Sequence, residues 1–431
     1  MPKFVVEGGV PLKGEIRPTG NKNAALPMIA ATLLTDEPVV LNNVPEIRDV
    51  KTLLDLMGTL GVTHEWIGPN RLRIHAADVK VSELSAGMSA RIRASILLAG
   101  PMLARVGRMT LPPPGGDVIG RRRVDTHFIA LAGLGAEIDT TGGYGLKTKG
   151  LKGARVFFDE PSVTATENAV MAASMAKGHT RFENVAAEPH VQDLCNMLNG
   201  MGAQISGIGT GTLEIDGVDR LRGGEFSITS DHIEVGSFIG LAAVTRGEIL
   251  IRDAALKHLD STLIGFDRLG IRCEAQGDDL LVPAEQDMRV RMDVGGHVPK
   301  IDDGPWPAFP ADLTSIMLVV ATQCHGTILI HEKMFESRMF FADKIIGMGA
   351  RVVLCDPHRA VVIGPSRLHA GVMESPDIRA GMGLLIAALG AEGESHIYNI
   401  AQIERGYERI DDRLRALGAR IERQDSREDD R

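Results

Sequence analysis

Long stretches of apolar residues alternate with amphipathic stretches along the whole chain. Six of the apolar stretches carry at most one charged residue each and are long enough to form helices. Helices that are apolar on every face lie inside a protein core. The segments that we predict as buried helices are Ala24–Leu34, Ile92–Ala104, Ala169–Ala176, Gly236–Val244, Leu313–Thr322 and Ala380–Leu389.

A short tripeptide marks the end of the amphipathic helix that follows each buried helix. It consists of Leu or Met, then Gly, then a small or aliphatic residue, and its copies are 67 to 79 residues apart. Glycine is favoured where a helix ends because it adopts the left-handed backbone conformation at little cost. The six copies are Leu60-Gly61-Val62, Leu134-Gly135-Ala136, Met201-Gly202-Ala203, Leu269-Gly270-Ile271, Met348-Gly349-Ala350 and Leu417-Gly418-Ala419.

These repeats predict an α/β fold with two domains. Each repeat of about 70 residues has the pattern strand, buried helix, strand, outer helix and closing strands. Polar segments at 18–21 and 229–232 are natural hinges between two groups of three repeats. We expect residues 1–21 and 231–422 to form the catalytic-side domain and residues 22–230 the second domain. The charged tail 423–431 is expected to be disordered.

Composition narrows the possible partners and the compartment. A net charge of −9 argues against nucleic acid, and no run of 18 or more apolar residues predicts a membrane span. The N-terminus lacks the apolar core of a signal peptide. The four cysteines have no metal-ligand spacing, so we expect reduced core residues in a cytoplasmic protein that needs neither metal nor organic cofactor. They are Cys195, Cys273, Cys324 and Cys355.

Candidate chemistry is concentrated in the loop at 112–127. Three prolines and two glycines precede Asp117, and three arginines follow it. Such a segment forms a loop, because proline and glycine disfavour helices and central strands. A carboxylate on a mobile lid beside fixed cations suits proton transfer to an anionic substrate. The alternative is an ordinary surface turn with solvated charges.

Charged residues at the starts of the predicted buried helices form a second candidate. Helix N-termini carry partial positive charge and unpaired N–H groups, so several starts in one cleft would bind an anion. A simpler explanation exists for each residue. Asp231 and Asp312 could be N-caps, and Lys22 could be an ordinary polar residue on the surface. Arg405 could belong to a solvated salt-bridge network. The charges recur at the same position in most repeats, however, which is poor for packing and useful for binding.

Taken together, these motifs resemble the family of UDP-N-acetylglucosamine 1-carboxyvinyltransferases, which are enolpyruvyl transferases. The resemblance covers about residues 3–422 and implies a two-domain inside-out α/β barrel. It also implies transfer of enolpyruvyl from phosphoenolpyruvate to the 3-hydroxyl of UDP-N-acetylglucosamine, the first committed step of peptidoglycan synthesis. The matching segments are Gly20–Pro27, Arg93–Ile96, the 115–127 loop, Phe309–Asp312, Phe335–Arg338 and Ile403–Ile410.

The resemblance assigns a role to individual residues. Asp312 corresponds to the base for the sugar hydroxyl, and Asp117 to the lid acid. Lys22, Arg122 and Arg405 correspond to the phosphoenolpyruvate cations, with Arg338 and Arg379 bordering that site and Asn23 contacting the intermediate. The residues expected to hold the UDP-sugar, together with Asn23 and Asp312, are Arg93, Arg122, Arg123, Val124, Asp125, Thr126, Ser162, Val163, Thr164 and Met334.

Departures from the family pattern give further expectations. Asp117 stands where cysteine is usual, so we expect the acid role to remain and the drug fosfomycin, which alkylates that thiol, to be ineffective. Arg123, Thr164 and His232 replace the usual proline, glycine and arginine, and Ala311 replaces a hydroxyl residue. A 3-phosphoshikimate enolpyruvyl transferase, or a non-catalytic or altered-acceptor paralogue that binds a nucleotide sugar, is therefore the alternative.

Overall fold

The computed structural model describes residues 2–79, 83–84, 86–116 and 123–425, and these form two compact units. Unit 1 consists of residues 2–19 and 230–425, and unit 2 of residues 20–116 and 123–229. Within the described residues, no helix is both long and apolar enough to cross a membrane.

Unit 1 contains three four-stranded sheets with one common pattern. In each sheet the first two strands are parallel, and the remaining neighbours are antiparallel. The N-terminal strands therefore complete sheets of the C-terminal part of the chain. The sheets are β21 (Val372–Glu374), β22 (Glu394–Tyr398), β1 (Lys3–Glu7) and β23 (Arg420–Gln424); β2 (Lys13–Ile16), β14 (Glu248–Ile251), β16 (Asp279–Val282) and β15 (Glu274–Gln276); and β17 (Lys300–Asp302), β18 (Gly326–His331), β20 (Arg359–Gly364) and β19 (Val352–Asp356).

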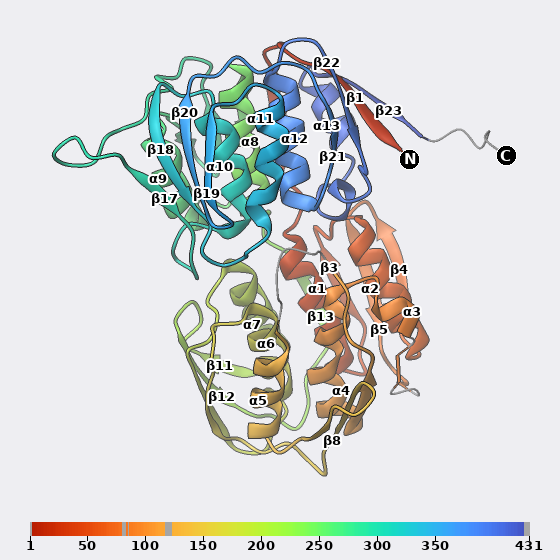
Figure 1. Ribbon diagram of the computed structural model, residues 1–431. Coiled ribbons are helices and arrows are strands. Elements are labelled where there is room, and N and C mark those ends of the chain that lie inside the picture. Colours follow the sequence, from red (N-terminus) through yellow and green to blue (C-terminus); the bar gives the residue numbers. More distant parts are fainter. Residues whose placement is uncertain (1, 80–82, 85, 117–122, 426–431) are drawn as a thin grey trace. The chain divides into compact units, whose positions relative to one another are not determined.

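Three helices fill the inside of unit 1. They pack against one another, and the sheets lie around them (Figure 1). These helices are α8 (His232–Thr245), α10 (Thr314–Ala321) and α12 (Ile378–Gly390), and all fourteen residues of α8 are buried. Shorter helices connect the strands: η3 (Leu256–His258), α9 (Asp260–Arg268), η4 (Ala311–Leu313), η5 (Arg338–Phe341), α11 (Ala342–Gly347), η6 (Ile403–Arg405) and α13 (Ile410–Ala416).

Unit 2 repeats this plan with one exception. Two of its sheets have four strands with the same directions, whereas in the third the described residues form three strands and one parallel bridge between Glu83 and Thr110. The sheets are β13 (Gly224–Ser227), β3 (Val39–Asn42), β5 (Arg71–His75) and β4 (Thr63–Gly68); β9 (Arg155–Phe157), β10 (His179–Glu183), β12 (Thr212–Asp216) and β11 (Gln204–Ser206); and β6 (Arg108–Leu111), β8 (Tyr144–Lys147) and β7 (Glu137–Asp139).

The inner helices of unit 2 include one that begins earlier than predicted. Helix α6 starts at Val163 rather than at Ala169, because the buried polar residues Thr166, Glu167 and Asn168 lie inside the helix. An apolar pattern could not include them. The inner helices are α1 (Lys22–Ala31) with η1 (Thr32–Leu34), η2 (Arg93–Leu98) with α4 (Ala99–Val106), and α6 (Val163–Ala173); the outer ones are α2 (Arg48–Thr59), α3 (Ala86–Ser89), α5 (Asp125–Gly133) and α7 (Pro189–Gly200).

Local turns confirm the repeat. All six tripeptide glycines have φ between 75° and 110°, the left-handed region in which glycine ends a helix. Asn43, Asn184 and Asn399 follow equivalent strands with φ of 57°, 58° and 57°. Each donates its side-chain amide to a carbonyl after the parallel neighbouring strand, over 2.8 to 3.0 Å. The repeated sequence thus encodes a repeated turn.

The cysteine prediction is only partly correct. All four cysteines are free thiols, and Cys195 and Cys324 are buried as expected. Cys355 is exposed and Cys273 is partly exposed, so these two are not core residues. Cys355 lies in β19, whose side chains alternate between partly and fully exposed positions.

Candidate active site

The predicted site residues fall into two sets. Unit 1 holds Asp312, Met334, Arg338, Arg379 and Arg405, whereas Lys22, Asn23, Arg93, 123–126 and 162–164 belong to unit 2. Asp117 and Arg122 lie outside the described residues. We build each set from its own unit.

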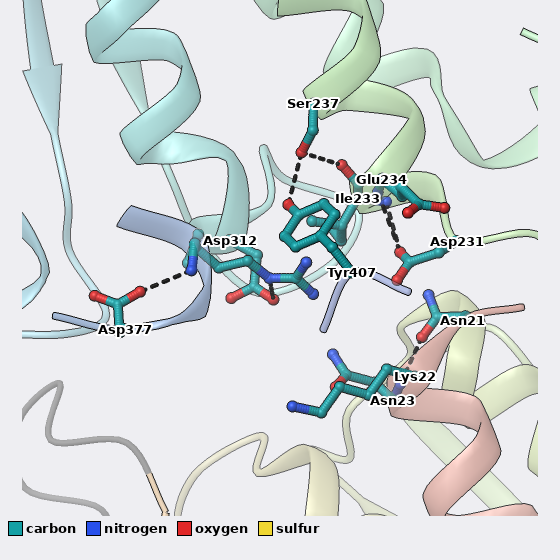
Figure 2. A network of polar contacts seen from close by, with 12 residues as sticks. Asn21, Lys22, Asn23, Asp231, Ile233, Glu234, Ser237, Asp312, Asp377 and Tyr407 are labelled. Carbon is teal, nitrogen blue, oxygen red and sulfur yellow. Dashed lines mark hydrogen bonds and ion pairs between the residues drawn. The ribbon is translucent and has the colours of Figure 1, made fainter. Parts of the chain in front are cut away.

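Side-chain caps fix the starts of two inner helices in unit 1. Asp231 Oδ1 accepts hydrogen bonds from Ile233 N (2.9 Å) and Glu234 N (3.4 Å) at the start of α8. Asp377 Oδ1 accepts from Arg379 N (2.8 Å) and Ala380 N (2.9 Å) at the start of α12. Figure 2 shows both caps. The N-cap interpretation of Asp231 is therefore confirmed.

Asp312 is not an N-cap, because its carboxylate is held by two arginines. Its Oδ1 lies 3.0 Å from Arg338 Nη1, and its Oδ2 accepts from Arg379 Nε at 3.0 Å. The arginine side chains are 4% and 6% exposed, whereas that of Asp312 is 26% exposed. Two buried cations thus meet one carboxylate that solvent still reaches.

The charges around Asp312 determine its protonation. Burial raises its pKa, but the charges and hydrogen bonds of Arg379 and Arg338 outweigh burial, so the pKa lies far below the ordinary value. Asp312 is therefore ionised at neutral pH. In this state it is a weak base, since a carboxylate held by two guanidinium groups is stabilised in its unprotonated form.

Arg379 and Arg338 also rest on aromatic rings. The Arg379 guanidinium lies 5.4 Å from the Tyr407 ring centroid, and Arg338 lies 4.9 Å from that of Phe335. The Tyr407 hydroxyl is 2.8 Å from Ser237 Oγ, as Figure 2 shows. These contacts stabilise each guanidinium while leaving part of its donor edge for other partners.

The other predicted residues of unit 1 are more accessible. Arg405 ends η6 and donates to Gln402 Oε1 over 2.9 Å. Met334 is 39% exposed and lies in the segment between β18 and η5. Arg405 is partly exposed, so its environment differs from that of Arg338 and Arg379.

In unit 2, Lys22 stands at the start of α1 and is buried. Asn21 caps this helix by accepting from Asn23 N (2.8 Å) and Ala24 N (3.2 Å), as Figure 2 shows. Lys22 Nζ lies 2.7 Å from Asp49 Oδ2, and the two side chains are 10% and 6% exposed. Lys22 is therefore not an ordinary exposed polar residue, and that alternative is wrong.

Arg93 and residues 123–126 form one hydrogen-bonded wall in unit 2. Arg93 Nη2 donates to the Arg123 carbonyl (2.8 Å), and Arg123 Nη2 donates to Asp159 Oδ2 (2.8 Å). Thr126 Oγ1 donates to Asp159 Oδ1 over 2.7 Å. Val124 precedes α5, and Asp125, its exposed first residue, accepts from Arg123 Nε. Asp159 thus organises the backbone and side chains at the start of α5.

A buried neutral network determines which atom of His127 carries the proton. Asn168 Oδ1 accepts from Gly100 N (2.7 Å), so its Nδ2 is the group that faces His127 Nδ1 at 2.9 Å. Nδ1 must then accept, and Nε2–H donates to Thr164 Oγ1 over 3.1 Å. Burial, with the nearby charge of Arg93, lowers the pKa of His127 to about 3. The imidazole is therefore neutral and leaves the Thr164 hydroxyl proton available for a ligand.

The start of α6 differs from the starts of α1, α8 and α12. Ser162 occupies the N-cap position, but its side chain makes no capping hydrogen bond. Ser162, Val163 and Thr164 are all partly exposed. A helix start without a side-chain cap is suited to a phosphate group, because its first N–H groups and partial positive charge favour an anion.

His232, which replaces the arginine usual in the family that the sequence resembles, is a buried residue. It is 3% exposed, and its ring lies 6.4 Å from that of His258 and 6.2 Å from that of Trp306, centroid to centroid. Burial, with His258, lowers the pKa of His232 to about 3. The His232 imidazole is therefore neutral at physiological pH.

Sequence reasoning missed the acidic and neutral partners of the predicted residues. No sequence motif contained or marked these partners, which are Asp49, Asp159, Asn168 and Glu332. His127 lay inside a motif but received no role. An acid or amide in an otherwise apolar segment is the one signal that could have marked Asn168. Within the part of the chain that the structure describes, no group of three His, Cys, Asp or Glu residues could hold a metal ion.

Comparison with known proteins identifies the family to which the chain belongs. The model of the EPSP synthase (3-phosphoshikimate 1-carboxyvinyltransferase) family matches residues 6–414. The UDP-N-acetylglucosamine 1-carboxyvinyltransferase of Bradyrhizobium diazoefficiens is 59% identical, over 98% of each chain. That of Treponema denticola is 55% identical, over 98% of this chain and 99% of its own.

Solved structures share the fold. The enolpyruvyl transferase NikO from Streptomyces tendae has a TM-score of 0.87 with 23% identity, covering 98% of each chain. EPSP synthase from Acinetobacter baumannii has a TM-score of 0.76 with 16% identity, covering 99% of this chain and 100% of its own. These likenesses confirm the predicted two-domain α/β fold.

Proposed function

The chain belongs to the UDP-N-acetylglucosamine 1-carboxyvinyltransferase family, and we propose that it catalyses that reaction. It transfers enolpyruvyl from phosphoenolpyruvate to the 3-hydroxyl of UDP-N-acetylglucosamine and releases phosphate. The observation that carries this proposal is the carboxylate of Asp312 held between Arg338 and Arg379 in a chain 59% identical to such an enzyme. We place the reaction in the cytoplasm, as the first committed step of peptidoglycan synthesis.

The proposed reaction is an addition followed by an elimination. The oxygen of the 3-hydroxyl attacks C2 of phosphoenolpyruvate, Asp312 accepts the hydroxyl proton, and Asp117 donates a proton to C3. In the resulting tetrahedral adduct, the C2–O bond to phosphate breaks and C3 loses a proton, which forms the enol ether. Lys22, Arg122 and Arg405 hold the charges of phosphoenolpyruvate, and Asn23 contacts the adduct.

We infer that phosphoenolpyruvate makes Asp312 a better base. The arginines that lower the pKa of Asp312 are the cations expected to border the phosphoenolpyruvate site. A substrate carboxylate or phosphate would compete with Asp312 for Arg338 and Arg379. When either guanidinium turns to the substrate, the pKa of Asp312 rises, because burial then acts with less compensation. Proton abstraction is thereby favoured once the second reactant is present.

The UDP-sugar is assigned to residues of unit 2 together with Asp312 and Met334. The uncapped start of α6 at 162–164 supports a phosphate contact, and the wall of Arg93 and 123–126 supports contacts to the remaining nucleotide. The Thr164 hydroxyl adds a hydrogen-bond donor where a glycine is usual. A carboxylate is a much weaker nucleophile toward an epoxide than a thiolate, so we propose that Asp117 makes the enzyme insensitive to fosfomycin.

Phosphate release from phosphoenolpyruvate tests the proposal directly. Release is expected with UDP-N-acetylglucosamine and not with shikimate 3-phosphate, and it is expected to be lost in Asp117→Asn but kept after incubation with fosfomycin. Asp356→Asn, which changes a partly exposed acid paired with Arg359, is the matched control. Nucleotide-sugar binding without phosphate release would support the non-catalytic or altered-acceptor alternative. Inactivation by fosfomycin would contradict the lid assignment.

A further inference from the structure

Two acidic side chains meet at the end of the parallel strand pair β17 and β18. Asp302 and His331 are partners in the register of these strands, so the next residues, Asp303 and Glu332, leave the sheet side by side. Asp303 N donates to the His331 carbonyl over 3.3 Å. The two residues are 2% and 0% exposed. Two carboxyl groups are thus buried at one sheet edge.

One oxygen of each carboxyl group binds the backbone. Glu332 Oε1 accepts from Met334 N (3.3 Å) and Phe335 N (3.2 Å), and Asp303 Oδ1 accepts from Lys333 N. The other oxygens, Asp303 Oδ2 and Glu332 Oε2, are buried and have no hydrogen bond of good geometry within the described part of the chain, although the Thr314 hydroxyl interacts with the Glu332 carboxyl and lowers its pKa. The two carboxyl groups are neighbours, because Asp303 and Glu332 follow paired residues of β17 and β18, and the Asp303 side chain raises the pKa of Glu332.

A proton between these two oxygens accounts for the arrangement. Two buried ionised carboxylates in contact would repel each other, and unsatisfied buried oxygens are costly. Arg338 does not replace the missing donor, because its Nε is 3.8 Å from Glu332 Oε2, beyond hydrogen-bonding distance. Burial and the hydrogen bond to Asp303 raise the pKa of Glu332 to about 9 despite the charge of Arg338.

We propose that Asp303 and Glu332 share one proton and act as positioning residues for Asp312 and Arg338. Asp303 begins the segment that ends at Asp312, and Glu332 begins the segment that ends at Arg338. The interaction between Asp303 and Glu332 therefore holds the first residues of these two segments together. The last residues of the segments, Asp312 and Arg338, form the ion pair. The catalytic consequence of the interaction rests on the proposed function, whereas the shared proton itself does not.

Isosteric amides test the shared proton. Glu332→Gln and Asp303→Asn each keep one hydrogen and one acceptor between the two groups, and each keeps one negative charge. Either single variant should retain kcat/KM for phosphoenolpyruvate within about threefold. The double variant places two NH2 groups against each other and removes the charge, so its kcat/KM should fall by about a hundredfold through misplacement of Arg338 and Asp312.

The pattern of activity among the variants separates this proposal from its alternatives. If Glu332 is instead the ionised partner of Arg338, Glu332→Gln alone will lose activity while Asp303→Asn will not, and the proposal is overturned. Asp302→Asn is the matched control, because that neighbouring acid pairs with Lys300 and Lys333 and is partly exposed. A double variant as active as the parent would also overturn the positioning role.

Infrared spectroscopy provides a readout that needs no substrate. The parent spectrum minus that of Glu332→Gln should contain the carbonyl band of a protonated carboxylic acid, and the same band should be missing in Asp303→Asn because Glu332 then ionises. Without that band in the parent, the proton is not shared. If the parent shows the band but releases no phosphate, the proposed function fails and the shared proton stands. The band decides the matter even if the double variant does not fold.

Discussion

The two units use opposite means to hold their predicted site residues. In unit 1, functional charges hold one another: Arg338 and Arg379 both bind Asp312, which is itself the predicted base. In unit 2, Lys22 pairs with Asp49 and Arg123 with Asp159, Arg93 donates to a backbone carbonyl, and a neutral network orients Thr164. A ligand that binds the arginines of unit 1 must therefore disturb the base, whereas a ligand in unit 2 need not.

This difference predicts that substitutions in unit 1 change the chemical step and those in unit 2 change stability or substrate binding. The arginine pair couples binding to the pKa of Asp312. The partners in unit 2 have no such coupling to the reacting atoms. The predictions below test that contrast in order of expected size.

The largest effect is expected for Asp312→Asn. The amide cannot accept the sugar hydroxyl proton, so kcat should fall by about a thousandfold. Calorimetric titration should still detect UDP-N-acetylglucosamine binding, because most of the residues assigned to it lie in unit 2. Steady-state kinetics with Asp356→Asn provides the control. A kcat within tenfold of the parent would exclude Asp312 as the base.

Asp49→Asn should mainly affect stability. It leaves the ammonium of Lys22 buried beside a neutral amide, which should lower the free energy of unfolding by about 3 to 5 kcal/mol. Glu46→Gln, which breaks the more exposed pair with Lys51, should cost under about 1 kcal/mol. Denaturant unfolding measures both variants. Equal decreases in the free energy of unfolding of the two variants would show that the buried Lys22–Asp49 pair stabilises unit 2 no more than an exposed ion pair does.

The pH dependence of stability should reveal the buried acid of unit 1. The pKa of Glu332 is raised from 4.5 to about 9, so folded Glu332 keeps a proton that the unfolded chain loses between these values. Its contribution to stability is therefore complete below pH 4.5 and is lost as the pH rises to about 9. Glu332→Gln should remove a slope of up to about 1.4 kcal/mol per pH unit. If the free energy of unfolding changes with pH in the same way in parent and variant, Glu332 is not protonated in the folded protein.

The smallest effect is expected for Thr164→Val. Valine removes the acceptor of His127 Nε2–H and the donor assigned to the UDP-sugar, so KM for that substrate should rise by about three- to tenfold at unchanged kcat. Thr164→Ser keeps the hydroxyl and should behave like the parent. A fall in kcat without a change in KM would mean that unit 2 also controls the chemical step.

The repeats, most of the inner helices and most candidate residues could be predicted from the amino-acid sequence. Apolar stretches predict burial from composition alone, and the glycine of each tripeptide predicts a helix end from a local backbone preference. The N-cap at Asp231 was also predictable, because a cap binds N–H groups only two and three residues away. Such features depend on neighbours in the chain.

The partners of the candidate residues could not be predicted from the sequence, because they depend on how the chain folds. Asp312 looked equally suited to capping a helix, but Arg379, 67 residues further along the chain, holds its carboxylate. The contacts between Lys22 and Asp49, His127 and Asn168, and Asp303 and Glu332 likewise join different elements. Burial makes these pairings strong because an unpaired charge or polar group there is costly, and burial is a property of the folded chain.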